Sequence, residues 1–343
     1  MLMLAALGLG GCSWVELAWN ALTYPTTRSG ESANVVVHGE WAYVTKGAAG
    51  IEVVHLERRE PTRVVPVQGG GESADDLAVA DGLLFVLDAR PAGHLAVYTL
   101  EDPSAPTLRN PPLPVEVGPF SGVSAAGGRV IVSGGTSRLS MRSYDRTGFL
   151  GSETVTADFG RGQPDVVLAA DGRAAYVSTH DWGPYFRMSV ATLASEPLQI
   201  IRRGVLPLDT YGFTPGGAKP ANFPIEGATD GSILYLAFAA GLGILDLADP
   251  SVPKLLALLE LDVEPVNVDV YDGVAALAGS SPSPRLVLVD VREPSRPKIL
   301  QSIPLPEDSL ATGVAIASSH VVVAAHGRGT LLFNRTSNTW ELP

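Results

Sequence analysis

Short apolar runs alternate with polar, glycine- and proline-rich turns along most of the chain. Runs of about four to eight residues rich in Val, Leu and Ile, bounded by such turns, predict β-strands. Two fifteen-residue stretches, LGILDLADPSVPKLL (242–256) and LVLVDVREPSRPKIL (286–300), align without a gap, and weaker copies occur at 51–65 and 95–109. Proline after Asp or Glu favours the second position of a type I turn, so each copy predicts a β-hairpin.

A second hairpin precedes each copy of this repeat. It is recognisable in ANVVVHGEWAYVT (33–45), DDLAVADGLLFVL (75–87), DVVLAADGRAAYVS (165–178) and NVDVYDGVAALA (267–278). Each of these segments has a glycine where the turn needs a positive φ, namely Gly39, Gly82, Gly172 and Gly273. The repeating unit is therefore four antiparallel strands in about 40–45 residues, which is the length of one β-propeller blade.

The starts of the first strands set the register of the units. They fall at Asn34, Asp76, Gly122, Asp165, Glu226, Asn267 and Gly313. Only the interval from Asp165 to Glu226 is much longer than the others, so that unit carries an insertion. Because radially stacked sheets cover one another and a closed ring protects their edges, we expect an all-β, seven-bladed β-propeller of four-stranded antiparallel blades at 33–343. A β-solenoid is the rival fold, but its rungs are much shorter than this period.

The segments VDVREPSRPKIL and LDLADPSVPKLL resemble LVIVD repeats, which are propeller repeats of bacterial and archaeal surface proteins. The resemblance covers four units clearly and the others by their period. It implies a secreted or surface-anchored propeller. The motif itself encodes a hairpin and carries no catalytic chemistry.

The chain has a single cysteine, Cys12, so no intrachain disulfide can form. It follows MLMLAALGLGG, an apolar stretch that ends in small residues, as a secretory signal does. The stretch Leu9 to Cys12 also resembles the bacterial lipobox, in which the cysteine is lipidated. We therefore expect a lipoprotein signal segment at 1–12 and a tether with a possible closing strand at 13–32. The alternative is a buried apolar segment with an inert thiol.

Charge and the residue after the cysteine narrow the location and partners. The formal net charge of −12 excludes the basic face that a nucleic-acid partner needs. Ser13 resembles the residue that follows the cysteine in lipoproteins sent to an outer membrane. The expected location is the bacterial cell envelope, with the membrane reached through the N-terminal lipid.

Loops that precede the first strand and loops that join the second strand to the third should lie on one face of the ring. The first group brings polar residues to the mouth of the central channel, namely Asn34, Asp76, Asp165, Glu226 and Asn267. The second group supplies the expected partner-binding residues His180, Asp181, Trp182, Tyr185, Arg187 and Arg328. Exposed aromatic residues on loops are typical of interfaces. The alternatives are an ordinary solvated rim and an Ω-loop whose rings pack on the blade.

Signals for an enzyme are weak. Asp76, Asp165 and Glu226 offer oxygens of the kind that Ca²⁺ prefers, but they come from different units. The sequence has no metalloprotease, nucleophile-elbow or Walker motif, and we expect no cofactor. The leading hypothesis is a non-catalytic propeller that binds an envelope protein or glycan through its loops. The alternatives are a metal-dependent hydrolase or lactonase-type enzyme that uses the channel-mouth carboxylates, and a scaffold subunit without a ligand.

Overall fold

The structure is a computed structural model. It describes residues 34–58, 61–68, 73–88, 93–109, 112–115, 122–134, 138–151, 154–158, 163–168, 174–180, 186–195, 198–207, 224–238, 241–249, 252–307, 309–326, 328–336 and 339–341. Within these residues, every regular element is a β-strand. Cys12 and the segments predicted at 1–12 and 13–32 lie outside the described residues, so the signal, tether and closing strand stay predictions.

The first half of the chain builds three sheets and begins a fourth. The first sheet contains β1 (Val35–His38), β2 (Trp41–Thr45), β3 (Ile51–His55) and β4 (Pro61–Val65). The next contains β5 (Asp76–Ala80), β6 (Leu83–Asp88), β7 (His94–Thr99), β8 (Thr107–Leu108) and β9 (Leu113–Pro114). The third contains β10 (Val123–Ala126), β11 (Arg129–Gly134), β12 (Arg138–Ser143) and β13 (Val155–Asp158). The fourth contains β14 (Gln163–Leu168), β15 (Ala174–His180), β16 (Phe186–Ser195) and β17 (Leu198–Pro207).

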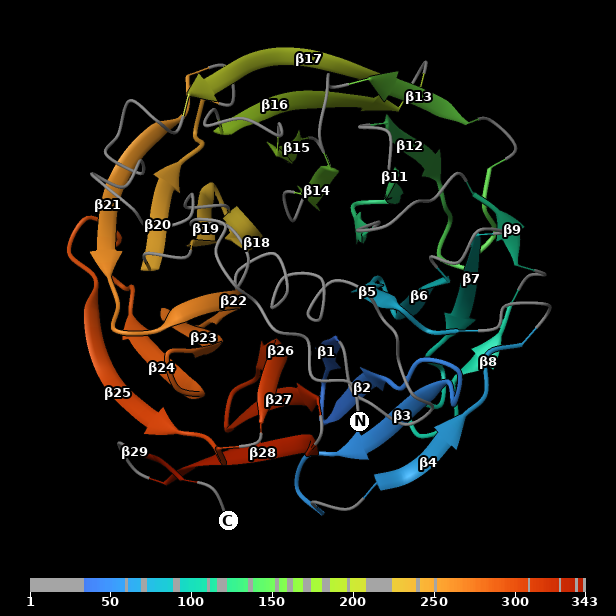
Figure 1. The fold of residues 1–343 in the computed structure, drawn as a ribbon. Coiled ribbons are helices and arrows are strands. Elements are labelled where there is room, and N and C mark those ends of the chain that lie inside the picture. Colours follow the sequence, from blue (N-terminus) through green and yellow to red (C-terminus); the bar gives the residue numbers. More distant parts are fainter. Residues whose placement is uncertain are drawn as a thin grey trace, which may run out of the picture.

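The remaining sheets follow the same plan. One contains β18 (Pro224–Asp230), β19 (Ile233–Phe238), β20 (Gly241–Asp246) and β21 (Lys254–Glu260). The next contains β22 (Glu264–Tyr271), β23 (Val274–Ser281), β24 (Arg285–Asp290) and β25 (Lys298–Pro304). The last contains β26 (Leu310–Ile316), β27 (His320–His326), β28 (Gly329–Thr336) and β29 (Thr339–Glu341). Every neighbouring pair is antiparallel, and the sheets stand around a central axis with their first strands innermost (Figure 1).

The prediction of seven four-stranded blades is wrong. In the described part of the chain, six sheets have four strands, and the sheet that begins with β5 has five. There the outer position is divided between β8, which pairs with Tyr98 and Thr99, and β9, which pairs with His94 and Leu95. Pro111 and Pro112 stand between the two short strands. Proline lacks the N–H that a strand ladder uses, so this run interrupts the outer strand.

The fifteen-residue repeat forms the outer hairpin of a blade, as predicted. Its two strongest copies form β20 with β21 and β24 with β25. The pairing register shifts between Ile244 and Leu245 in one copy and between Leu288 and Val289 in the other. A third copy has the same shift between Val53 and Val54. These are the third and fourth residues of each copy, so the repeat encodes a β-bulge together with its turn.

The fifth residue of each copy begins the turn between the two strands of the hairpin. Its side chain accepts a hydrogen bond from the backbone N–H two residues later, which closes the turn. The Asp246 Oδ1 accepts from the N–H of Ala248 at 2.8 Å, and the Asp290 Oδ1 accepts from that of Arg292 at 3.1 Å. In the weaker copies the Thr99 Oγ1 accepts from the N–H of Glu101 at 3.3 Å, and the His55 Nδ1 accepts from that of Glu57 at 3.2 Å. Four different copies therefore use three different side chains for one hydrogen bond.

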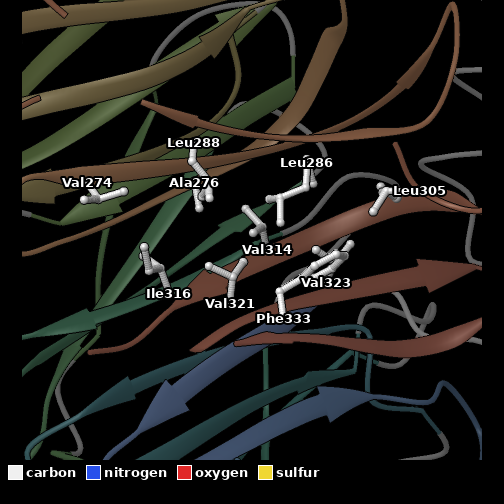
Figure 2. Packing of buried hydrophobic residues seen from close by; sticks show 12 residues of the cluster. Val274, Ala276, Leu286, Leu288, Leu305, Val314, Ile316, Val321, Val323 and Phe333 are labelled. Carbon is white, nitrogen blue, oxygen red and sulfur yellow. The ribbon is translucent and has the colours of Figure 1, made fainter. Parts of the chain in front are cut away.

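The core lies between neighbouring sheets. Figure 2 shows Leu286 and Leu288 of β24 facing Val314 of β26 and Val321 and Val323 of β27, all of them buried. Comparable clusters lie between other neighbouring sheets. Apolar residues on both faces of each strand are needed because every sheet is covered on both sides.

The ring closes by packing its first sheet against its last. One buried cluster combines Val35, Ala42 and Val44 of the first sheet with Val322 and Ala324 of β27. Figure 1 shows β1 beside β26 and β27. The first and last described sheets are therefore neighbours in one ring.

Candidate functional site

The strand register places the predicted loops on one face of the ring. The beginning of each first strand lies beside the end of its second strand, as in Asp76 with Leu87, Gln163 with His180 and Leu310 with His326. The loops that join second to third strands therefore lie on the same face as the channel mouth. We call this the channel-mouth face.

Asp76 links its own blade to the blades on both sides of it at this face. Its Oδ1 accepts the N–H of Leu77 at 2.8 Å, and its Oδ2 accepts the N–H of Val123 in the next blade at 2.7 Å. The Nδ2 of Asn34, from the preceding blade, also donates to Oδ1 of Asp76. The innermost strand of a blade has no further strand on its channel side, so alternate N–H groups there need another acceptor. Asp76 supplies that acceptor for two strands.

Asp269 forms the same kind of bridge on another pair of blades. Its Oδ1 accepts the N–H of Val270 at 2.8 Å, and its Oδ2 accepts the N–H of Ile316 in the next blade at 2.9 Å. Relative to Asn267, which aligns with Asp76, this residue lies two positions further along its strand. Sequence reasoning missed it because it falls inside a strand, although an acid at an inward β position was a usable signal.

Burial dominates the ionisation of both bridging carboxylates. Desolvation raises the pKa of Asp76 to about 6, against hydrogen bonds from Val123, Leu77 and Asn34 that favour the ionised form. Desolvation also raises the pKa of Asp269 to about 6, against hydrogen bonds from Ile316 and Val270. The backbone N–H groups therefore compensate only part of the cost of burying each charge.

The channel between the first strands contains an open cavity of about 320 Å³. Residues of β1, β5, β10, β18, β22 and β26 line it, among them Asp76, Asn267 and Asp269, together with Asn34 just before β1. No lysine, arginine or histidine is among these lining residues of the described chain. Of the predicted channel-mouth residues, Asn34, Asp76 and Asn267 thus lie together at the channel.

The other two predicted channel-mouth residues are placed by their backbone. Asp165 lies in β14 and Glu226 in β18, both innermost strands. Their side chains lie outside the described residues. Among the described residues, no group of three or more His, Cys, Asp or Glu side chains lies close enough to hold a metal ion.

The predicted partner loop is described only at its two ends. His180 ends β15 and pairs with Phe186, and Arg187 in β16 pairs with Thr179. Asp181, Trp182 and Tyr185 lie in the connection between these strands, outside the described residues. The register thus places His180 and Arg187 in strands and leaves residues 181–185 for the connection between them. The long interval of this unit is partly explained by β16 and β17, which are ten residues long each.

Arg328 lies on the same face, in the connection from β27 to β28, and its side chain is exposed. Nearby in the fold, a buried ion pair of the first blade accepts a hydrogen bond from the last blade. The Lys46 Nζ lies 3.1 Å from the Glu52 Oε2, and the Thr330 hydroxyl of β28 donates to the same oxygen at 2.6 Å. No motif in the sequence signals Glu52 or Thr330 as a neighbour of Lys46.

No protein-family model and no curated protein matches this chain. Solved structures match its fold. U3-55K shares 11% identity over 86% of this chain and 88% of that one, with a TM-score of 0.62. The RRP9 WD40 repeats share 12% identity over 91% of this chain and 90% of that one, also with a TM-score of 0.62. A proposed 6-phosphogluconolactonase from Bacteroides fragilis shares 13% identity over 92% of this chain and 94% of that one, with a TM-score of 0.61. At these identities the similarity shows the β-propeller fold alone.

Proposed function

We propose that this protein is a non-catalytic β-propeller that binds an envelope protein or glycan at its channel-mouth face. The observation that carries the proposal is the use of Asp76, whose two oxygens accept hydrogen bonds from two backbone N–H groups and the Asn34 amide. A carboxylate whose oxygens already accept three hydrogen bonds holds blades together and has little capacity left for a substrate or a metal ion. The geometry of the described channel therefore supports binding over hydrolysis.

The partner site is proposed to include the loop between β15 and β16 with Arg328 on the same face. Its aromatic residues, Trp182 and Tyr185, supply the large contact area on which protein and glycan recognition depends. Replacing both with alanine should abolish partner capture in a pull-down from the native envelope and leave the melting temperature nearly unchanged.

Two exposed aromatic residues on the opposite face provide a matched control. Phe149 lies between β12 and β13 and is 62% exposed, and Tyr271 lies at the β22–β23 turn and is 47% exposed. Their double alanine variant should capture the partner normally. Capture lost in this control but kept in the Trp182 and Tyr185 variant would place the site on the other face.

We also propose that Cys12 is lipidated and anchors the chain to a membrane. Among the described residues, no helix is long and apolar enough to span a bilayer. Acyl chains contribute about 0.8 kcal/mol per buried CH₂, and more than one chain holds a protein firmly. A Cys12→Ser variant should therefore move from the membrane fraction to the soluble fraction after cell fractionation. Unchanged membrane association in that variant would contradict the proposal.

A further inference from the structure

Strand β21 is an apolar edge at the rim of the ring. Its sequence, KLLALLE, has charged residues only at its two ends, Lys254 and Glu260. The ends are exposed and the five apolar residues between them are half-buried. In the described part of the chain β21 pairs only with β20, and Figure 1 shows it on the outer circumference. Such an edge offers unpaired N–H and C=O groups beside apolar side chains.

The other outer strands carry the features that normally prevent edge pairing. Proline, internal charge, polar residues or short length interrupts each of them. In the described chain these strands are β4 (PTRVV), β8 (TL), β9 (LP), β13 (VTAD), β17 (LQIIRRGVLP), β25 (KILQSIP) and β29 (TWE). Among the outer strands of the described chain, β21 is the one that has five consecutive apolar residues.

We propose that β21 pairs antiparallel with β21 of a second copy of this chain, forming a two-fold symmetric dimer. In that arrangement Lys254 lies opposite Glu260 of the second copy, and Leu255 lies opposite Leu259. The strand is therefore complementary to itself in charge and in apolar contacts, as a two-fold interface requires. Each charge pair occurs twice because of the symmetry.

The bulge in β21 preserves this complementarity. Leu245 pairs with Leu255 and Ile244 pairs with Ala257, which leaves Leu256 as the extra residue. If Leu256 is counted, the pairing centres on Ala257. If it is left out, the pairing centres between Ala257 and Leu258. Both alignments place Lys254 opposite Glu260, so the charge pairing does not depend on how the bulge is accommodated.

The rest of the molecule favours this surface. Leu256, Ala257 and Leu259 pack against the buried cluster shared with the next sheet, so this face of the strand is already held in place. A preformed edge loses little conformational freedom on pairing. Contact at the rim also leaves the channel-mouth face of both copies open.

Sedimentation velocity over a concentration series of the full chain tests the proposal. A two-strand contact is small, so we expect wild-type dimers with a dissociation constant in the micromolar range. Lys254→Glu and Glu260→Lys should each weaken dimerisation about tenfold or more, because two attractive pairs become two repulsive ones. An equimolar mixture of these two variants should restore the dimer, since one supplies two acids and the other two lysines. The double variant Lys254→Glu/Glu260→Lys should dimerise like the wild type.

The corresponding end of the next outer strand provides the control. Lys298→Glu in β25 should leave the dimer unchanged, and circular dichroism should show that all variants are folded. A wild-type chain that stays monomeric up to about 100 μM would overturn the proposal. So would a dimer that tolerates both single substitutions, or a mixture of the two variants that fails to associate.

Discussion

Replacing Glu52 with alanine is expected to lower the free energy of unfolding by about 3–5 kcal/mol, because the buried Lys46 ammonium would lose the carboxylate that faces it. Both side chains are 10% exposed, and the Lys46 Nζ lies 3.1 Å from the Glu52 Oε2. Thr330 of the last blade also donates to Glu52, so the substitution removes a polar contact across the ring closure. Urea-induced unfolding followed by circular dichroism measures the change.

An exposed ion pair provides the control for this substitution. The Arg296 Nη1 lies 3.5 Å from the Glu293 Oε1, and the two side chains are 76% and 59% exposed. Glu293→Ala should therefore change the stability by no more than about 0.5 kcal/mol. The double variant Lys46→Met/Glu52→Leu should recover most of the lost stability, since an apolar pair avoids the cost of burying charge. Equal losses in Glu52→Ala and Glu293→Ala would contradict the buried-pair explanation.

The repeated hairpin could be predicted from sequence because its information is local. Pro250 and Pro294 follow an acidic residue in each copy, and backbone bonds from Val252 to Asp249 and from Arg296 to Glu293 close the predicted turns. The number of strands in each sheet was less predictable. A pair of prolines beyond the second hairpin splits one outer strand into β8 and β9, and only the pairing with β7 shows that both belong to the same sheet.

The candidate site was predicted in position but not in chemistry. Strand period and register were sufficient to predict Asn34 and Asp76 at the channel mouth, and in the structure both line the channel and the Asn34 amide donates to Asp76. The role of Asp76 depends on a backbone N–H of the next blade, 47 residues away. An acid in an innermost strand signals a polar role at the channel, but the sequence does not show which backbone N–H of the next blade it accepts. Asp269, with its equivalent bond to Ile316, was not identified because it falls inside a strand and not at the start of one.

The stability of the wild type relative to an Asp269→Asn variant is expected to fall as the pH rises from about 4 to about 6. Burial raises the pKa of Asp269 from 3.8 to about 6 in the folded protein. Between these two values the folded state binds more protons than the unfolded state, so the free energy of unfolding decreases with rising pH. The contribution is fully present below about pH 4 and is lost above about pH 6. One pKa unit corresponds to about 1.4 kcal/mol, which gives a change of about 3 kcal/mol across this range.

Unfolding by urea at pH 4, 5, 6 and 7, with each variant compared with the wild type, isolates the contribution of one carboxyl group. Asp76→Asn should show the same direction, because burial raises the pKa of Asp76 to about 6 as well. Asp290→Asn is the control: the hydrogen bond from Arg292 lowers the pKa of Asp290 to about 2, so its contribution changes only below about pH 4. A wild-type advantage that grows with pH would mean that the N–H groups of Val270 and Ile316 outweigh the cost of burial. The bridging carboxylates would then stabilise the fold most when they are ionised, and their contribution to the free energy of unfolding would be largest at neutral pH.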